Sequence, residues 1–216
     1  MQVIPAINAS DFNAAKNSID KAKEFGSEWI HLDVGDGIFS SIETWGNSEE
    51  FQKLQLSSAS WRIKTEVHLM IIDPFNYAER WLAAGVKRLI VHLETIGSLD
   101  VDTLLNVCGK YGADLMLSVN PVASVEKLNP YLNKVNFFQI LSVMPGKAGQ
   151  AFQDSTLKKI VYLRERRPDA KIEIDGGINL ETARMVKDAG ADIIVSASYI
   201  YNSKDPKEAF TNLVQV

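Results

Sequence analysis

The sequence contains a single cysteine, Cys108, among its 216 residues. One cysteine excludes an internal disulfide, and its place in an apolar helical stretch predicts a buried, unreactive thiol. Long apolar runs are also missing, because no stretch approaches the about 18 residues that a membrane-spanning helix needs. The N-terminal run MQVIPAIN begins as a strand and has no cationic leader before it. We therefore expect a protein of the reducing cytoplasm, with neither an export signal nor a membrane span.

An excess of positive charge is missing as well. The formal net charge is −4, and the basic residues are dispersed apart from a short stretch at 164–167. Nucleic acid is therefore not an expected partner. The composition of 46% hydrophobic and 23% charged residues is enough for a full core, and no linker, low-complexity segment or charge block divides the chain. We expect one domain over residues 1–216.

One pattern recurs along the chain: a helical stretch, a glycine, one or two small or polar residues, and an apolar run. It is found in FGSEWIHLD, AGVKRLIVHLE, YGADLMLSVNP and AGADIIVSAS, with glycines at Gly26, Gly85, Gly112 and Gly190. A glycine just past a helix end favours the left-handed backbone that turns the chain into the next strand. The glycine separations of 59, 27 and 78 residues are close to two, one and three copies of a unit of 26 to 30 residues. This spacing suggests eight β/α units.

Hydrophobic periodicity supplies the elements between these joints. Asp11 and Asn179 are typical residues for the first turn of a helix. Regular alternation of strand and helix implies a parallel sheet, and eight units at this length favour a closed (β/α)8 TIM barrel over an open doubly wound sheet. The expected strands span 2–7, 28–34, 62–69, 87–93, 114–119, 135–142, 171–175 and 192–197. The expected helices span 11–25, 47–55, 74–84, 99–110, 122–130, 155–166, 179–189 and 205–214.

Four residues lie at or near the ends of expected strands: His31, Asp33, His68 and Asp175. His31 and Asp33 are two apart, so the pleat of a strand points both side chains to one face. The strands of a barrel aim such side chains at its mouth, where residues distant in sequence can share one ion. Each residue alone is readily explained as a satisfied polar group, but their coincidence favours a divalent metal, with Zn, Fe(II), Mn and Co all compatible.

Glycine-bearing or small-residue turns follow the sixth, seventh and eighth expected strands. In barrels of this kind, the turns after the last strands commonly bind phosphate through backbone N–H groups. One such turn alone is more simply turn chemistry, but three at the same face predict a phosphate site. The candidate phosphate-binding residues are Gly146, Lys147, Ala148, Gly149, Gly176, Gly177, Ala197 and Ser198.

The segments HLDVGDG, VHLM, PGKAGQ and IDGGIN, in this order, resemble the signature segments of ribulose-phosphate 3-epimerases. The resemblance extends over nearly the whole chain. It implies an isomerase on a (β/α)8 barrel, with one divalent metal held by His31, Asp33, His68 and Asp175. It also implies that Asp33 and Asp175 are the two acid/base groups, that a phosphorylated ketose is the substrate, and that the chain forms a homo-oligomer. The implied reaction converts D-ribulose 5-phosphate to D-xylulose 5-phosphate through an enediolate.

Several positions depart from that family pattern. Ala6 stands where a serine is usual, Gly35 and Leu141 stand where methionines are usual, and Lys147 replaces an apolar residue of the phosphate turn. Together with Ile38, which is also unusual, these changes predict retained chemistry and an altered sugar pocket. Lys147 is equally compatible with a contact to phosphate and with a position in solvent. A 3-epimerase for another ketose phosphate, such as D-allulose 6-phosphate, is the main alternative.

Two further alternatives belong to other classes. A sugar-phosphate-binding homologue without catalysis is disfavoured, because both histidines and both aspartates are retained. The orotidine-phosphate decarboxylase group has an Asp-x-Lys pattern on the same type of barrel, whereas this chain has His31-Leu32-Asp33. We expect His92 to be a strand-end histidine outside the metal's ligand set, near Glu94. Glu173, which should face the barrel interior, is expected to orient a ligand by a hydrogen bond.

Overall fold

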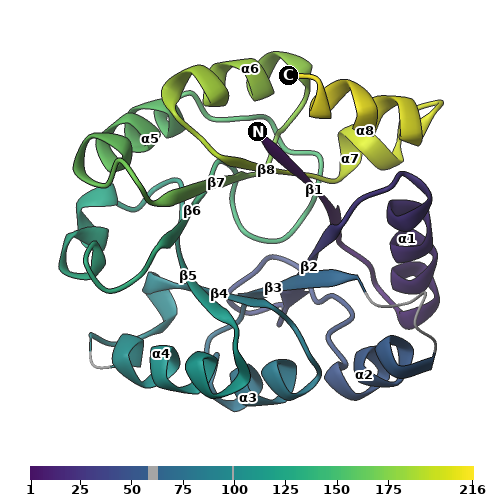
Figure 1. Ribbon diagram of the computed structural model, residues 1–216, viewed down its shortest axis with the longest axis horizontal. Helices are drawn as coiled ribbons and strands as arrows, with labels where there is room; N and C mark the ends of the chain where they lie inside the picture. The colour runs from purple at the N-terminus through teal and green to yellow at the C-terminus, as the bar shows by residue number, and fades with distance from the viewer. Residues whose placement is uncertain (58–62, 99) are drawn as a thin grey trace.

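Eight parallel strands form a closed barrel in the computed structural model, which describes residues 1–57, 63–98 and 100–216. Each strand pairs with the next one in the chain, and β8 pairs with β1. Figure 1 shows the strands around a central axis with the helices in an outer ring. The predicted (β/α)8 barrel is therefore confirmed. The strands are β1 (Gln2–Ile7), β2 (Trp29–Gly35), β3 (Lys64–Met70), β4 (Arg88–His92), β5 (Asp114–Val119), β6 (Phe137–Leu141), β7 (Lys171–Asp175) and β8 (Ile193–Ser196).

The helices follow the expected positions with one correction. Residues 122–130 do not form an α-helix, because the segment Val125–Tyr131 is a 3-10 helix, η3. Pro130 lies inside it, and a proline has no N–H for an α-helical bond and disfavours α geometry in the residue before it. Positions 62 and 99, expected to start a strand and a helix, lie outside the described residues. The other helices are α1 (Phe12–Glu24), α2 (Ser48–Ser57), α3 (Phe75–Ala83), η2 (Leu93–Thr95), α4 (Asp100–Tyr111), α5 (Ser155–Arg166), α6 (Leu180–Ala189), α7 (Ser198–Tyr201) and α8 (Pro206–Val214).

The predicted joints are confirmed. The Asp11 side chain accepts a hydrogen bond from Ala14 N at the start of α1, and Asn179 forms a capping box with Thr182 at the start of α6. Gly26 and Gly190, which follow α1 and α6, have φ values of 83° and 108°. These left-handed conformations let the chain leave each helix and enter the following strand directly.

Alternation along the strands divides the side chains between two cores. On β2, Ile30, Leu32 and Val34 belong to the large apolar core between the strands and the outer helices. His31 and Asp33 alternate with them and point into the barrel, as the period of two predicts. Because both faces of each strand are covered, polar groups inside the barrel are removed from solvent.

The barrel interior is itself divided. Next to β1 and β8 it is apolar, where Ile4, Ala6, Ile193 and Val195 form a separate small cluster. The remaining strands place imidazole, carboxylate, guanidinium and amide groups inside, and these are buried except for Asp175, which is partly exposed at the mouth. The polar inward residues are His31, Asp33, Glu66, His68, Arg88, His92, Ser118, Gln139, Glu173 and Asp175.

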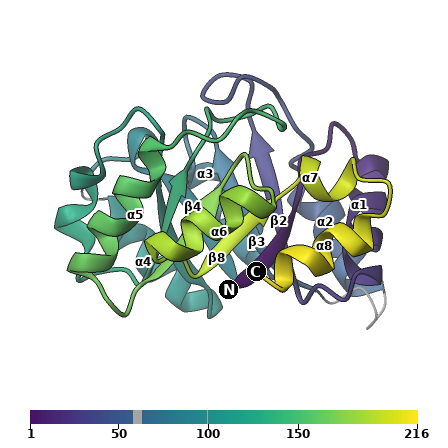
Figure 2. The same ribbon diagram turned by 90° about the horizontal axis from the view of Figure 1, so that it is seen from above.

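The long connections after β2 and β6 leave the barrel at the same end. Figure 2 shows both rising above the strands, while the two termini lie at the opposite end. Ser41 N in the first connection donates a hydrogen bond to Pro145 O in the second, over 3.3 Å. The two connections therefore meet over the carboxyl ends of the strands, which is the end where barrels of this type carry their active sites.

The structure also bears on two expectations from the composition, the state of the Cys108 thiol and the lack of a membrane-spanning helix. Cys108 is buried on α4, and burial raises the pKa of its thiol to about 12. The thiol is therefore protonated and unreactive at neutral pH, as predicted. Among the described residues, no helix combines the length and the apolarity that crossing a membrane requires.

Candidate functional site

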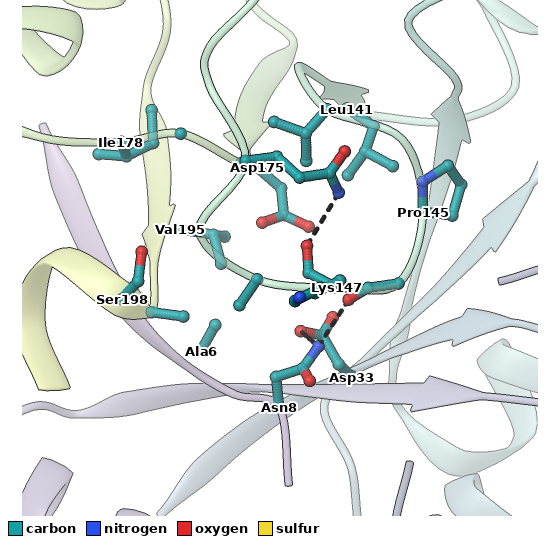
Figure 3. Close-up of a pocket in the computed structure, with 18 of the residues that line it drawn as sticks. Ala6, Asn8, Asp33, Leu141, Pro145, Lys147, Asp175, Ile178, Val195 and Ser198 are labelled. Carbon is teal, nitrogen blue, oxygen red and sulfur yellow. Dashed lines mark hydrogen bonds between the residues drawn. The ribbon is translucent and has the colours of Figure 1, made fainter. Parts of the chain in front are cut away.

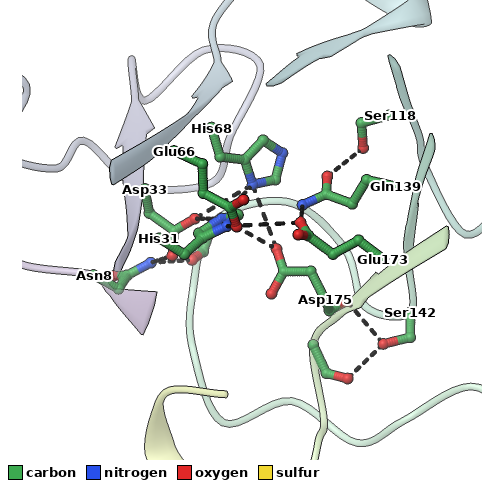
Figure 4. A network of polar contacts seen from close by, with 12 residues as sticks. Asn8, His31, Asp33, Glu66, His68, Ser118, Gln139, Ser142, Glu173 and Asp175 are labelled. Carbon is green, nitrogen blue, oxygen red and sulfur yellow. Dashed lines mark hydrogen bonds and ion pairs between the residues drawn. The ribbon is translucent and has the colours of Figure 1, made fainter. Parts of the chain in front are cut away.

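The four candidate ligands converge at the carboxyl end of the barrel. His31 Nε2 lies 3.3 Å from Asp33 Oδ1 and 3.7 Å from Asp175 Oδ2, and His68 Nδ1 lies 3.4 Å from both of these oxygens. One donor atom from each residue lies within 4.8 Å of all the others. The side chains come from β2, β3 and β7, as Figure 4 shows. The structure thus brings together the residues that the sequence singled out.

The spacing of these atoms fits a divalent transition metal. Bonds of about 2.0 to 2.1 Å from a metal to nitrogen and oxygen in a tetrahedron place neighbouring ligand atoms about 3.3 to 3.4 Å apart. Three of the four imidazole-to-carboxylate distances are 3.3 or 3.4 Å, and the fourth is 3.7 Å. Two imidazoles and two carboxylates are also a donor set that such metals accept. The residues present therefore fit the metal that the sequence predicts.

His31 is oriented by the buried ion pair of Glu66 and Arg88. Its Nδ1 lies 2.7 Å from Glu66 Oε1, and Arg88 Nη1 donates to Glu66 Oε2 over 2.5 Å. The Arg88 guanidinium lies 4.8 Å from the Trp29 ring centroid and 4.2 Å from that of Phe137, so aromatic faces surround the buried cation. When His31 is neutral with its proton on Nδ1, donated to Glu66, the lone pair of its Nε2 is directed at the ligand cluster.

His68 is oriented by another histidine. Its Nε2 lies 2.8 Å from His92 Nε2, and His92 Nδ1 lies 3.5 Å from Glu94 Oε2. Burial lowers the pKa of His92 to about 4, so this imidazole is neutral at neutral pH and one of its nitrogens can accept a hydrogen bond. His92 does not belong to the ligand cluster, in agreement with the sequence-based expectation.

Glu173 does not have the expected role. Its Oε1 lies 3.8 Å from His31 Nδ1 and accepts a hydrogen bond from Gln139 Nε2 over 3.0 Å, so Glu66 is the carboxylate that orients His31. Burial, and then the neighbouring charge of Glu66, raise the pKa of Glu173 well above its usual range. These surroundings favour the protonated form of Glu173. Ser118 Oγ donates to Gln139 Oε1 over 2.6 Å and continues this network across the barrel.

The charges of the ligand cluster support one another. Burial opposes ionisation of His31, but its contacts with Asp33 and Glu66 raise its pKa well above the usual value. Burial likewise opposes ionisation of Asp33, but hydrogen bonds from His31 and His68 lower the pKa of this carboxyl group. Asp33 is therefore a carboxylate at neutral pH, which is the form that binds a cation.

A pocket lies directly above this cluster, and Asp33 and Asp175 are part of its wall. Figure 3 shows the two carboxylates entering it from different sides. All three predicted phosphate turns contribute to the same pocket, and Lys147, although exposed, also lines it. The candidate phosphate-binding residues that line the pocket are Gly146, Lys147, Ala148, Gly149, Gly176, Gly177, Ala197 and Ser198.

The glycines after β7 let the backbone itself form the pocket wall. Gly176 and Gly177 have φ values of 106° and 62°, which favour glycine. A Cβ atom on Gly176 would lie 2.4 Å from Val143 Cγ2, and one on Gly177 would lie 2.6 Å from Phe152 N. No side chain fits at either position, so this part of the wall presents bare peptide groups.

The substitutions expected at the sugar end divide into two groups. Leu141 lines the pocket, as predicted. Gly35 and Ile38 line a separate groove beside it, and Ile38 is 74% exposed. A Cβ on Gly35 would lie 2.4 Å from Ser40 Oγ, so the path of the connection after β2 excludes a side chain there. The prediction that Gly35 and Ile38 shape the sugar pocket is therefore wrong, because both line the neighbouring groove.

Asn8 is a polar residue of the pocket that the sequence patterns did not identify. It follows the last residue of β1 and lines the pocket together with Ala6, two positions earlier. Its Nδ2 donates hydrogen bonds to Asp33 Oδ2 over 3.1 Å and to Gly146 O over 3.0 Å. Its position just beyond a strand that points Ala6 inward was the signal that could have identified it.

Comparisons with known proteins agree with this geometry. The family model described as "Ribulose-phosphate 3 epimerase family" matches residues 2–201. A ribulose-phosphate 3-epimerase from Chlamydia pneumoniae is 34% identical over 205 residues, which cover 92% of this chain and 87% of that protein. The enzyme of that name from Bacillus subtilis is 30% identical over 218 residues, covering 99% of this chain and 98% of that protein.

Solved structures with a similar fold have much lower sequence identity. The 3-hexulose-6-phosphate synthase of Salmonella typhimurium has a TM-score of 0.75 and 15% identity, with coverage of 100% of this chain and 97% of that chain. The orotidine 5'-phosphate decarboxylase of Pyrococcus horikoshii has a TM-score of 0.66 and 18% identity, with coverage of 98% and 97%. These similarities support the barrel fold alone.

Proposed function

The chain belongs to the ribulose-phosphate 3-epimerase family, and from this we propose that it epimerises C3 of a ketose phosphate, most readily D-ribulose 5-phosphate to D-xylulose 5-phosphate. It is an isomerase. One observation carries the proposal: two carboxylates, Asp33 and Asp175, line one pocket together with three turns suited to phosphate, directly above the cluster of histidines. The identity of the metal, the preferred sugar and the acid or base role of each aspartate are parts of this proposal.

His31, Asp33, His68 and Asp175 would hold a divalent metal, with Zn, Fe(II), Mn and Co all suited to these ligands. When bound, such an ion acts as a Lewis acid that stabilises negative charge on the oxygens next to the reacting carbon. The protein's own contribution is to orient both imidazoles so that one nitrogen of each faces the ligand cluster. Glu66 does this for His31 and His92 does it for His68.

Inversion at C3 requires one base and one acid on opposite faces of the substrate. A carboxylate oxygen of one aspartate removes the C3 proton, and the electron pair of the C–H bond moves toward the C2 carbonyl to give an enediolate. The other aspartate, in its protonated form, then returns a proton to C3 from the opposite face. One proton leaves and one arrives, so the product is an isomer. Asp33 and Asp175 exchange these duties in the reverse reaction.

The phosphate of the substrate is proposed to bind to the turns after β6, β7 and β8. The peptide groups at Gly176 and Gly177 are bare, and small residues at Ala197 and Ser198 leave space beside them. Backbone N–H groups bind an anion without depending on a particular side chain. Binding energy at this end positions C3 between the two aspartates. A homo-oligomer stays a prediction from the family resemblance, and a cytoplasmic location stays a prediction from the composition of the sequence.

A panel of substrates tests the proposal. The metal-reconstituted protein is incubated separately with ribulose 5-phosphate and allulose 6-phosphate, and the C3 epimer is separated and quantified. We expect turnover of ribulose 5-phosphate. A higher kcat/KM with allulose 6-phosphate would support the hexose alternative, which the substitution of Leu141 in the pocket motivates. Tight binding of both compounds with no epimer formed would instead identify a binding protein without catalysis.

A further inference from the structure

Asn8 contacts both halves of the pocket at once. It is half-buried beyond the end of β1, and its amide bridges Asp33 on β2 and Gly146 in the turn after β6. These two partners are 113 residues apart in the chain. Asn8 therefore connects a carboxylate of the ligand cluster with the turn assigned to phosphate, as Figure 3 shows.

The chemistry of the amide fixes its orientation. An asparagine NH2 group has two donor hydrogens, and here each faces one acceptor, Asp33 Oδ2 at 3.1 Å and Gly146 O at 3.0 Å. Rotation of the amide by 180° would place its oxygen against a carboxylate oxygen and a carbonyl oxygen. This one orientation makes both bonds, and movement of the turn would remove the Gly146 acceptor that helps to hold the amide against Asp33.

The two carboxylate oxygens of Asp33 face different partners. Oδ1 faces the imidazoles, at 3.3 Å from His31 Nε2 and 3.4 Å from His68 Nδ1. Oδ2 faces Asn8. A carboxylate held at both oxygens cannot rotate about its Cβ–Cγ bond, so Asn8 sets the plane in which Oδ2 meets the substrate.

The position of Gly146 is also narrowly defined. Its φ is 119°, and a Cβ there would lie 2.6 Å from Ser41 Oγ and 2.8 Å from Ser41 N. Its carbonyl is thus directed by a close approach between the connections after β2 and β6. An anion bound in the turn would hold the Gly146 peptide in this place.

We propose that Asn8 is a positioning residue that couples occupation of the phosphate turn to the orientation of Asp33. This inference rests on the proposed function. Anion binding keeps Gly146 O within reach of the amide, the amide keeps Asp33 Oδ2 in its reactive plane, and proton transfer at C3 then becomes faster. By linkage, an anion in the turn also binds more tightly when Asp33 is held in this way.

Phosphite tests the coupling, because it supplies the dianion separately from the sugar. Exchange of the C3 hydrogen of unphosphorylated D-ribulose is followed by proton NMR in deuterated water, with metal-loaded protein and increasing phosphite. In the wild type, saturating phosphite is expected to accelerate exchange. In Asn8→Ala and in the shape-matched Asn8→Leu, this acceleration should fall by about fivefold or more, the usual range for coupled sites. Thermal unfolding of each variant verifies that it is folded.

Gln150→Ala is the matched control. Gln150 Nε2 donates to Met144 O and Lys147 O, so it supports the same turn without contacting Asp33. This variant should require more phosphite, measured as a higher dissociation constant by calorimetry, but should keep the acceleration at saturation. Equal acceleration in Asn8→Ala and wild type would overturn the inference. Acceleration absent from a wild type that still epimerises ribulose 5-phosphate would also overturn it, whereas loss of exchange with every ketose phosphate would refute the proposed function itself.

Discussion

The Nε2 atoms of His68 and His92 lie 2.8 Å apart, so one of these imidazoles donates a hydrogen bond to the other. His68 Nδ1 faces the oxygens of Asp33 and Asp175. If that nitrogen is to bind a cation, the proton of His68 must be on Nε2, and His92 Nε2 must accept it. The proton of His92 is then on Nδ1, which lies 3.5 Å from Glu94 Oε2. The tautomers of the two buried rings are thus coupled through this one contact, and a cation at His68 Nδ1 would fix both.

Replacing His92 is expected to weaken metal binding. In His92→Phe the ring is kept but the acceptor for His68 is lost, and the metal dissociation constant should rise by about 10- to 100-fold. His92→Gln retains an acceptor and should lie between this variant and the wild type. Calorimetric titration of the apoprotein with Zn²⁺ or Co²⁺ measures the effect. Identical affinities in all three proteins would show that His92 does not orient His68.

Glu66 and Arg88 form a buried ion pair whose disruption should cost stability. Arg88→Met removes the guanidinium that pairs with Glu66 Oε2, and losing one partner of a buried pair costs about 3 to 5 kcal/mol. The double variant Glu66→Gln/Arg88→Met leaves no uncompensated charge and should be more stable than Arg88→Met alone. Urea unfolding of the wild type, both single variants and the double variant completes the cycle. Additive losses would contradict the coupling.

The turn after β7 should be sensitive to a single methyl group. Gly177→Ala places a Cβ 2.6 Å from Phe152 N at a φ of 62°, so the turn must shift, and the dissociation constant for inorganic phosphate should rise by about tenfold or more. Gly109→Ala, within α4, is the control, because its Cβ meets no heavy atom within 4 Å in the described part of the chain. It should leave phosphate affinity unchanged and raise the free energy of unfolding by about 0.5 to 1 kcal/mol.

Asp192 should contribute stability at neutral pH that is lost in acid. Burial would raise the pKa of its carboxyl group, but hydrogen bonds from Ile172 N and Arg164 lower it overall. The folded protein therefore binds this proton less readily than the unfolded chain, and stability falls as pH drops through the folded pKa, below about 4. For the partly exposed side chain, Asp192→Asn should cost about 1 kcal/mol at pH 7. Urea unfolding of the metal-free proteins measures this effect. The difference in the free energy of unfolding between Asp192→Asn and the wild type should shrink below about pH 4. A difference that grows below about pH 4 would contradict the lowered pKa of Asp192.

The sequence predicted the ligand cluster because its signals are local. The period of two places His31 and Asp33 on one face, and a polar residue at the end of an apolar run predicts the mouth of a barrel. The partner of His31 was not predictable in this way. Glu66 and Glu173 both point inward, and the choice depends on register: His31 pairs with Glu66 across β2 and β3, and Glu66 pairs in turn with Arg88.

Loops limited the prediction of the pocket. Asn8 lies outside a strand, so periodicity does not place it, and its role depends on a turn 138 residues away. Ile38 was assigned to the sugar end by its position in a motif, but the Asp36 side chain accepts bonds from Ile38 N and Phe39 N and turns this connection outward. Such contacts depend on the path of the chain in three dimensions, which the sequence patterns do not specify.

The proposed reaction depends on two aspartates at C3 of a ketose phosphate, one that removes a proton and one that returns a proton from the opposite face. Its most direct test follows hydrogen exchange at C3 of D-ribulose 5-phosphate in deuterated water by proton NMR, with metal content measured in every sample. The wild type should incorporate deuterium at C3 and form D-xylulose 5-phosphate, and Asp175→Asn should be slower by a factor of about 10² or more at equal metal content. Full activity in Asp175→Asn, or absence of exchange in the metal-saturated wild type, would contradict the account.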